Sequence, residues 1–358
     1  MRIAVDAQST EGRRTGIGQA AEVLLTAMAK AAPDIEWLLL KKGGSGDLNT
    51  PQRILWESCQ IPSRAKRLKA DLIYSPGFAP PMRASVPRIV TVHDLIGMTY
   101  RGNQGSISSF YWSKWLPAAV KRAHHLAASS EATRKDIERL LGIPSDRISV
   151  VPCAAHPRYR VLDDAAAVNT IVKKYGLDRP YLISVCTSEP RKNLDRLVRA
   201  YGRLSRTTRE KACLAVIGKQ GPAGDSVRAA VDVAGLRNDV RFLGYVPDED
   251  LVSLYNGSIG YACVSLAEGF GLPALEAMRC GKSGVASNTS SLPEVVGDTA
   301  VSVDPQDEAA IGSALERWIT DGSLRAQLSA RARERSLLFS PERSAQSMIN
   351  IFREQVKK

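Results

Sequence analysis

Two glutamates that flank a glycine-rich turn are the residues whose types and spacing most clearly suggest chemistry. The turn follows an apolar, strand-like run at residues 259–264 and precedes a helical pattern that ends at residues 280–281. A helix start after such a turn leaves backbone N–H groups that bind anions such as phosphate, and paired carboxylates suit the vicinal hydroxyls of a sugar or a ribose. We therefore predict a sugar-nucleotide site in this stretch. Its residues are Glu268, Gly269, Phe270, Gly271, Leu272, Pro273, Ala274, Leu275 and Glu276.

Two adjacent cations, Arg191 and Lys192, follow the apolar run Tyr181–Val185 and open a helical segment. A positive charge at a helix start opposes the helix dipole unless an anion lies nearby. We therefore favour binding of a diphosphate, with Arg191 as a fork and Lys192 as a point charge, over a solvated surface pair. Lys219 follows another apolar run, and the sequence leaves open whether it reaches the same ligand.

The amino-terminal half contains two further candidate positions at the expected carboxyl ends of strands. Gly16 and Gly18 follow the first apolar run and open a helix, so the backbone there could approach a ligand closely; a plain loop is the alternative. His93 and Asp94 close the run Ile89–Val92. A histidine beside an aspartate at such an edge is favoured as a substrate contact over a core position.

Histidine, cysteine and acidic residues show no spacing typical of a metal site. The histidines at 124, 125 and 156 are expected to be structural. The six cysteines are scattered, which favours reduced, buried thiols over a disulfide or zinc framework. The acidic run at 248–250 precedes a helical pattern and is interpreted as a helix start. We expect no metal and no cofactor.

Length and composition indicate a two-domain globular protein. The chain has 358 residues, of which 44% are apolar and 24% charged, and a chain of this length can bury two cores. It contains no run of eighteen apolar residues, and its first residues form a strand-like pattern without an apolar signal region. These features predict a cytoplasmic protein.

The net charge of +12 is uneven, because residues 1–165 hold 23 Lys and Arg against 15 Asp and Glu. No nucleic-acid motif accompanies this charge, so a solvated basic surface and a weak preference for anionic membrane remain as alternatives. An aromatic stripe in the same half is interpreted as core packing or as a peripheral lipid-facing surface at the inner face of the plasma membrane. The stripe consists of Ile107, Phe110, Tyr111 and Trp115.

Short apolar runs alternate with helical segments along the whole chain, which predicts parallel sheets covered on both faces. We infer an α/β protein with two doubly wound, Rossmann-like domains, residues 1–165 and 166–340, that face a ligand cleft at the carboxyl ends of the strands. Ser340 and Pro341 are expected to start a final helix over residues 341–358. The predicted strands are Arg2–Asp6, Trp37–Leu40, Leu72–Tyr74, Ile89–His93, Leu126–Ser129, Ile148–Val151, Tyr181–Val185, Cys213–Ile217, Val240–Leu243, Ile259–Val264, Gly284–Ser287 and Ala300–Val303.

Together these motifs resemble the retaining glycosyltransferases of family four, the group 1 family with the two-domain GT-B architecture. The resemblance covers nearly the whole chain and is most specific at residues 181–193 and 261–305; Lys282-Ser283-Gly284 departs from the usual Thr-Pro-Val. It implies that the first domain receives the acceptor, the second holds the nucleotide sugar, and the last helix crosses back onto the first. By this likeness Glu268 would lie at the transferred sugar, Glu276 would hold the ribose, and His93 would touch the donor sugar. The residue patterns and the resemblance together give catalytic candidates Glu268, His93, Arg191 and Lys192, and donor-binding candidates Gly16, Gly18, Asp94, Lys219, Gly269, Phe270, Gly271, Leu272 and Glu276.

The resemblance implies a metal-independent, retaining transfer of a hexose, with mannose from GDP-mannose as the first choice. The acceptor would be a glycan or lipid-linked saccharide, as in polysaccharide or lipopolysaccharide biosynthesis. The same chemistry with a UDP- or dTDP-sugar, and a non-catalytic sugar-nucleotide-binding subunit, are the alternatives. Cleavage of a sugar–diphosphate bond places negative charge on the departing phosphate, which the two cations at 191 and 192 would stabilise.

Overall fold

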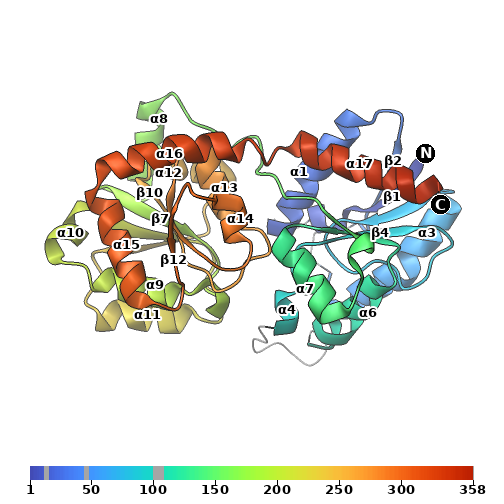
Figure 1. The fold of residues 1–358 in the computed structure, drawn as a ribbon, viewed down its shortest axis with the longest axis horizontal. Helices are drawn as coiled ribbons and strands as arrows, with labels where there is room; N and C mark the ends of the chain where they lie inside the picture. Colours follow the sequence, from blue (N-terminus) through green and yellow to red (C-terminus); the bar gives the residue numbers. More distant parts are fainter. Residues whose placement is uncertain (12–15, 44–47, 100–108, 358) are drawn as a thin grey trace. The chain divides into compact units, whose positions relative to one another are not determined.

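The computed structural model describes residues 1–11, 16–43, 48–99 and 109–357. They form two compact units, which we name unit 1 (Met1–His156 with Phe339–Lys358) and unit 2 (Pro157–Leu338) (Figure 1). Each unit is built on one six-stranded sheet, and every strand pairing is parallel. The α/β, doubly wound architecture expected from the alternating apolar runs is therefore confirmed. The boundary expected after residue 165 falls within unit 2 in this division of the chain.

The sheet of unit 1 has the strand order β2-β1-β3-β4-β5-β6. Its central strands are continuous apolar runs with both faces covered, which is why they lack the alternation of a half-exposed sheet. The chain leaves β1 toward β2 and returns on the other side as β3, so the order reverses between β1 and β3. Ligands of open α/β sheets bind outside the carboxyl ends of strands at such a reversal. The strands are β1 (Arg2–Asp6), β2 (Glu36–Leu40), β3 (Leu72–Ser75), β4 (Arg88–Val92), β5 (His125–Ala128) and β6 (Ile148–Val150).

The carboxyl-terminal helix completes the core of unit 1. Ser340 accepts a hydrogen bond from Arg343 N at 3.2 Å, so the predicted cap of this helix is confirmed. α17 packs along α1, and Phe352 is fully buried with its ring 5.0 Å from that of Tyr74. The last helix therefore belongs to unit 1, as expected. The helices of unit 1 are η1 (Ala7–Thr10), α1 (Gly16–Ala31), α2 (Thr50–Leu55), η2 (Trp56–Gln60), α3 (Ile61–Arg67), α4 (Ile96–Thr99), η3 (Tyr111–Trp115), α6 (Leu116–Lys121), α7 (Glu131–Leu141), η4 (Ser145–Arg147) and α17 (Pro341–Lys357).

Most of the described aromatic stripe faces the core of unit 1 and not a lipid surface. Tyr111 is 2% exposed and donates a hydrogen bond to Glu57 at 2.7 Å. Trp115 packs against the same apolar cluster and donates to the other oxygen of Glu57 at 3.3 Å. Phe110 is exposed, and Ile107 lies outside the described residues. Core packing, one of the two interpretations of the stripe, therefore holds for Tyr111 and Trp115.

The sheet of unit 2 has the order β12-β11-β10-β7-β8-β9, so its strand order reverses between β7 and β10. The twelve strands found among the described residues coincide with the twelve predicted ones to within one residue at each end. The short apolar runs are clearly bounded by Gly, Pro and polar residues, which is why the strand ends agree so closely. The strands of unit 2 are β7 (Tyr181–Val185), β8 (Cys213–Ile217), β9 (Val240–Gly244), β10 (Gly260–Cys263), β11 (Gly284–Ser287) and β12 (Val301–Val303).

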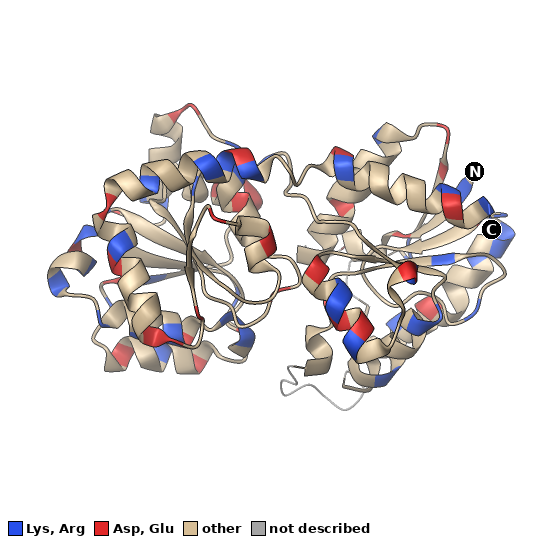
Figure 2. Ribbon diagram, in the orientation of Figure 1, with Lys and Arg blue, Asp and Glu red and all other residues tan. Residues whose placement is uncertain are grey.

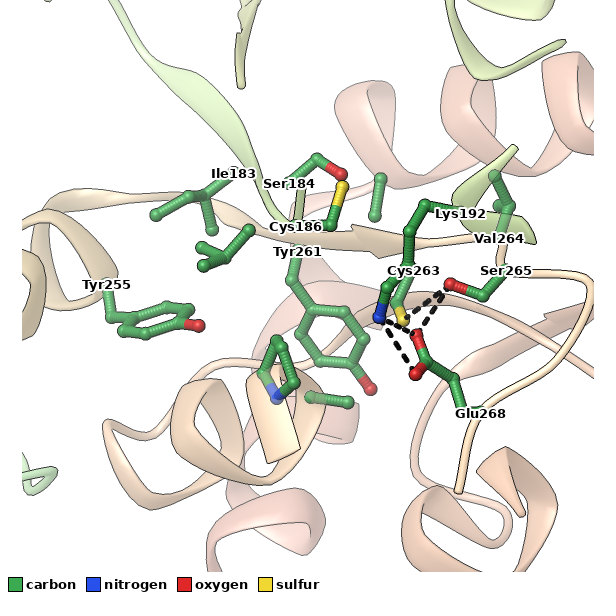
Figure 3. Close-up of a pocket in the computed structure, with 14 residues that line it drawn as sticks. Ile183, Ser184, Cys186, Lys192, Tyr255, Tyr261, Cys263, Val264, Ser265 and Glu268 are labelled. Carbon is green, nitrogen blue, oxygen red and sulfur yellow. Dashed lines mark hydrogen bonds and ion pairs between the residues drawn. The ribbon is translucent and has the colours of Figure 1, made fainter. Parts of the chain in front are cut away.

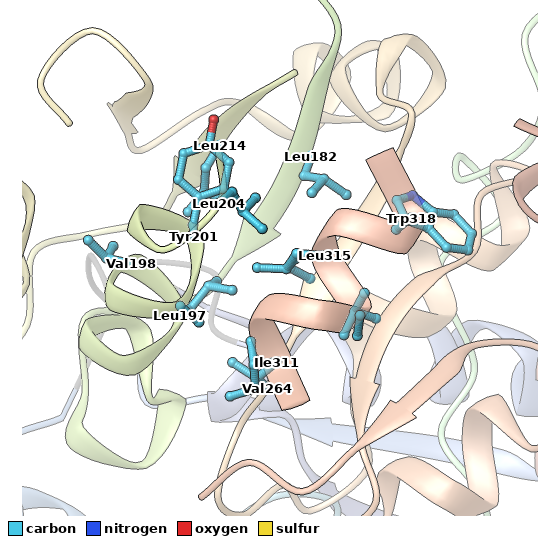
Figure 4. Close-up of a cluster of buried hydrophobic side chains, with 14 of the residues drawn as sticks. Leu182, Leu197, Val198, Tyr201, Leu204, Leu214, Val264, Ile311, Leu315 and Trp318 are labelled. Carbon is cyan, nitrogen blue, oxygen red and sulfur yellow. The ribbon is translucent and has the colours of Figure 1, made fainter. Parts of the chain in front are cut away.

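The core of unit 2 lies between the sheet and the helices on either side of it. Figure 4 shows side chains of β7 and β8 meeting those of α9 and α15, among them Leu182, Leu197 and Leu315. The acidic run at 248–250 occupies the first turn of α12, so its interpretation as a helix start is confirmed. The helices are α8 (Ala165–Lys174), η5 (Pro190–Lys192), α9 (Leu194–Gly202), α10 (Arg206–Lys211), α11 (Gly224–Val233), α12 (Asp248–Gly257), α13 (Leu272–Arg279), α14 (Leu292–Val296), α15 (Glu308–Thr320) and α16 (Gly322–Ser336).

Charged residues are distributed over the helices of both units. Figure 2 shows Lys and Arg interspersed with Asp and Glu, for example on α7, where Arg134 pairs with Glu131 and Glu138. Within the described residues, no helix combines the length and the apolarity needed to cross a bilayer.

Candidate active site

The strand-order reversal of unit 2 brings the two most informative sequence motifs together. The loop after β7 carries Arg191 and Lys192, and the loop after β10 carries Glu268. A backbone hydrogen bond joins the two loops, because Leu266 N donates to Arg191 O at 2.8 Å. The two motifs are far apart in sequence, but they meet because β7 and β10 are neighbouring parallel strands whose carboxyl ends lie at the same edge.

Lys192 and Glu268 form a buried ion pair at this edge (Figure 3). Lys192 Nζ lies 2.7 and 2.9 Å from the two carboxylate oxygens of Glu268, and the side chains are only 10% and 7% exposed. Arg191 Nη1 lies 3.3 Å from Glu268, while its Nε contacts Glu189 at 2.8 Å. The structure therefore brings three of the predicted catalytic residues within direct contact, around one carboxylate.

Both members of the central pair are held in their charged forms. Burial would raise the pKa of Glu268, but Lys192 and then Arg191 outweigh burial, so the pKa of Glu268 lies below its ordinary value. Burial would lower the pKa of Lys192, but the Glu268 carboxylate outweighs it, so the pKa of Lys192 is raised. A dry site that keeps two cations beside one carboxylate can hold a second anion, such as a diphosphate.

Serine and asparagine side chains that were not among the predicted site residues position this pair. Ser265 donates to Glu268 Oε1 at 2.7 Å, and Ser291 donates to the Glu268 carbonyl at 2.9 Å. Asn193 adopts a left-handed backbone conformation with φ of 60°. Its side-chain amide donates to the carbonyls of Val264 at 3.0 Å and Pro305 at 2.7 Å. Asn193 directly follows Lys192 in the sequence, and this position beside a charged candidate was the one sequence signal for these roles.

The glycine turn before α13 matches the conformation that its sequence predicts. Gly271 has φ of 102°, and a Cβ there would lie 2.7 Å from Leu292 Cδ2, so only glycine fits without strain. Pro273 has no N–H, and Ala274 and Leu275 donate to the Gly271 carbonyl. The amino-terminal end of α13 therefore has fewer free backbone N–H groups than an ordinary helix start. A diphosphate bound there would depend mainly on the cations at 191 and 192.

Glu276 lies in a separate, tyrosine-lined environment inside unit 2. The residue is 6% exposed, and its carboxyl accepts a hydrogen bond from Tyr255 OH at 3.0 Å. The ring of Tyr159 lies edge-on to that of Tyr255, with centroids 5.8 Å apart. Burial raises the pKa of Glu276 to about 8, and Tyr255 opposes the shift. The carboxyl is therefore neutral over most of the physiological pH range.

We expect Glu276→Gln to stabilise the protein increasingly as the pH rises. The folded pKa of Glu276 is raised to about 8, whereas an unfolded glutamate titrates at about 4.3. Between these values only the folded state binds the proton, so the wild type loses up to about 1.4 kcal/mol of stability per pH unit. Glutamine does not titrate. Urea unfolding of both proteins from pH 5 to pH 8 measures this, and a stability difference that stays constant with pH would contradict it.

In unit 1 the ring nitrogens of His93 are both engaged. Nε2 lies 2.8 Å from the Pro76 carbonyl, and Nδ1 lies 3.7 Å from the Cys153 thiol. Because a carbonyl only accepts, Nε2 carries the proton and Nδ1 faces the S–H. Burial lowers the pKa of His93, so the ring is neutral. Contact of His93 with a donor sugar stays a prediction and requires that one of these partners be exchanged.

The remaining candidates have simpler surroundings. Asp94 accepts a hydrogen bond at 3.0 Å from the N–H of Ile96, the first residue of α4. Gly16, the exposed first residue of α1, could carry a Cβ without meeting any atom within 4 Å, and Gly18 is buried in the same helix. Lys219 is exposed, with its amine 5.8 Å from the Tyr245 ring centroid. Over the described ranges, no group of three or more His, Cys, Asp and Glu is arranged to hold a metal ion.

Two family models match the chain, and each covers most of one unit. Residues 168–335 match glycosyl transferases group 1, and residues 25–158 match glycosyltransferase family 4. A curated relative, the O-antigen chain mannosyltransferase B of Escherichia coli, is 34% identical over 305 residues, which span 85% of this chain and 77% of that protein. The serotype-specific mannosyltransferase WbdA of E. coli is 32% identical over 271 residues, but these span only 33% of its length.

Solved structures share the fold across nearly the whole chain. WaaG, a glycosyltransferase involved in lipopolysaccharide biosynthesis, matches with a TM-score of 0.75 and 15% identity, over 96% of this chain and 98% of that one. The sucrose-phosphate synthase of Thermosynechococcus elongatus matches with a TM-score of 0.77 and 19% identity, over 99% and 98%. These similarities support the GT-B fold and, at such low identity, nothing finer.

Proposed function

The chain belongs to the group 1 glycosyltransferases of family four, and from this premise we propose that it transfers mannose from GDP-mannose to a saccharide acceptor of the O-antigen type, with retention. The family makes the chain a hexosyltransferase. The choice of mannose and of a polysaccharide acceptor is supported by the two E. coli relatives, an O-antigen chain mannosyltransferase and a serotype-specific mannosyltransferase. The observation that carries the proposal is the contact of Lys192 and Arg191 with Glu268 at the strand-order reversal.

In the proposed reaction, the bond between the anomeric carbon and the phosphate oxygen breaks and its electron pair leaves with the diphosphate. The acceptor oxygen attacks on the same face, bonds to the anomeric carbon and passes its proton to the departing diphosphate oxygen, so the configuration is retained. Lys192 and Arg191 stabilise the charge that grows on the leaving group, which is worth about 3 kcal/mol by comparison with a single oxyanion donor. Glu268 lies at the sugar and holds both cations in place before the donor binds.

We also propose that the transfer needs no metal ion. The support is the charge of the site, because Arg191 and Lys192 supply next to the diphosphate the positive charge that a divalent cation supplies elsewhere. Neither cation depends on a metal for its position, since Glu268 and Glu189 hold them. Activity that disappears with a chelator and returns with magnesium would contradict this part of the proposal.

A panel of nucleotide sugars tests the function directly. We expect release of GDP from GDP-mannose, faster than any release from UDP- or dTDP-sugars, in the presence and absence of a chelator. NMR of the product should show the anomeric configuration of the donor. Faster turnover of another donor would reassign the base or the sugar. Tight binding of a nucleotide sugar without turnover in any acceptor mixture would favour a non-catalytic binding subunit.

A further inference from the structure

A groove with a volume of about 560 Å³ lies at the amino ends of β10 and β11 in unit 2. Asn256 and Gly257 line it just before β10, and Cys280, Gly281 and Lys282 line it just before β11. Glu268 follows the opposite, carboxyl end of β10. Because a strand rises about 3.3 Å per residue, a four-residue strand separates the two edges by about 13 Å. The groove is therefore separate from the site described above.

Two cations line the groove, Lys282 from the turn after α13 and Arg333 from the last turns of α16. In the described part of the chain neither has a carboxylate partner, and burial lowers the pKa of Lys282. The neighbouring arginines of α16 differ, because Arg331 pairs with Asp298 and Arg335 donates to the Val295 carbonyl. A half-buried ammonium without a nearby anion is unfavourable. An anion bound in the groove would therefore stabilise the charged form of Lys282.

The rest of the lining suits a small organic molecule attached to that anion. Val161, Leu162 and Val168 form an apolar wall, and Asn169 offers a polar side chain. The volume lies within the range of about 300–1,000 Å³ typical of small-molecule sites. Lysine with arginine is the combination that recognises phosphate, Lys as a point charge and Arg as a fork. We propose that this groove binds a small phosphorylated molecule, with its phosphate between Lys282 and Arg333.

The groove is connected to the candidate active site through two helices. α13 carries Glu276 and ends at the groove, while α12 carries both Tyr255, which bonds Glu276, and Asn256, which lines the groove. Asn256 also fixes the groove wall, because its side-chain oxygen accepts from Leu162 N at 2.9 Å and its amide donates to the Arg160 carbonyl at 3.0 Å. A ligand in the groove thus contacts the segments that position Glu276.

Calorimetric titration of the full chain with glucose 6-phosphate tests the proposal, with glucose at the same ionic strength as the neutral control. We expect saturable binding of the phosphate ester and none of glucose. Lys282→Gln and Arg333→Gln should each weaken it about tenfold or more, the loss typical of a charge-assisted hydrogen bond. Arg331→Gln, the same change on the same helix outside the groove lining, should bind like the wild type.

Absence of saturable binding, or equal affinity of wild type and Lys282→Gln, would overturn the proposal. Equal affinity would also show that any binding occurs elsewhere, including at the donor site. Arg333 is exposed, so its substitution separates a lost contact from a folding defect. The test uses neither GDP nor transfer activity. The groove proposal can therefore fail while the proposed transferase function holds, and the transferase function can fail while the groove proposal holds.

Discussion

Lys192→Ala is expected to lower kcat/KM for GDP-mannose by about a hundredfold to a thousandfold, the loss seen when one donor to a developing anion is removed. The variant removes the amine that lies 2.7 Å from Glu268 Oε1 and that, in the proposal, meets the departing diphosphate. It also leaves the buried Glu268 carboxylate with Arg191 as its remaining cation. Initial rates of GDP release over a range of donor concentrations measure the effect.

Lys174→Ala is the matched control, because it removes a lysine of unit 2 whose side chain is 59% exposed and pairs with Asp250 at 2.7 Å. Asp250 also accepts a hydrogen bond from Tyr175 OH at 2.7 Å, so it keeps a partner when Lys174 is removed, and this variant should turn over like the wild type. If Lys192→Ala keeps its fold by circular dichroism and retains more than half of wild-type kcat/KM, Lys192 does not stabilise the leaving group.

Glu268→Gln is expected to separate binding from turnover. Glutamine keeps the shape of the side chain and can accept the hydrogen bond from Ser265, but it no longer neutralises Lys192. The freed ammonium should bind GDP as tightly as in the wild type or more tightly. Turnover should fall by about a hundredfold, since the group at the sugar has lost its charge. Calorimetry with GDP and steady-state rates with GDP-mannose measure the two effects independently.

Glu249→Gln is the control for this change, because Glu249 in α12 is 83% exposed. This variant should leave both GDP binding and turnover unchanged. Weaker GDP binding and unchanged kcat in Glu268→Gln would be opposite to both expectations. Such a result would place Glu268 at the nucleotide and not at the sugar.

The sequence contains enough information for the architecture and for the charged residues of the site. Its strands are short apolar runs bounded by turn residues. In unit 2, β7 and β10 are adjacent in the sheet, so the loops that follow them are neighbours. Arg191 and Lys192 were selected because two cations at a helix start oppose its dipole unless an anion lies nearby, and Glu268 was selected because it borders a glycine turn between a strand and a helix. Their mutual contact depends on the strand order, which local patterns do not encode.

Other features required the three-dimensional structure. Tyr255 and Tyr159 are ordinary aromatic core residues in sequence, and only packing shows that they surround Glu276. The aromatic stripe favoured a core position and left a lipid-facing surface as the alternative, and contacts with Glu57, more than fifty residues away, support the core position for Tyr111 and Trp115. Such long-range polar partners leave no periodic signal, so they are not predictable from one sequence.

The central claim is that Lys192 binds the diphosphate of a nucleotide donor. Titration of wild type and Lys192→Ala with GDP and with guanosine tests it most directly, because the two ligands differ only in the charged group. The account predicts that the variant binds GDP about tenfold to a hundredfold more weakly, as for the loss of a charge-assisted hydrogen bond, and binds guanosine as the wild type does. Equal GDP affinity in the two folded proteins would contradict it.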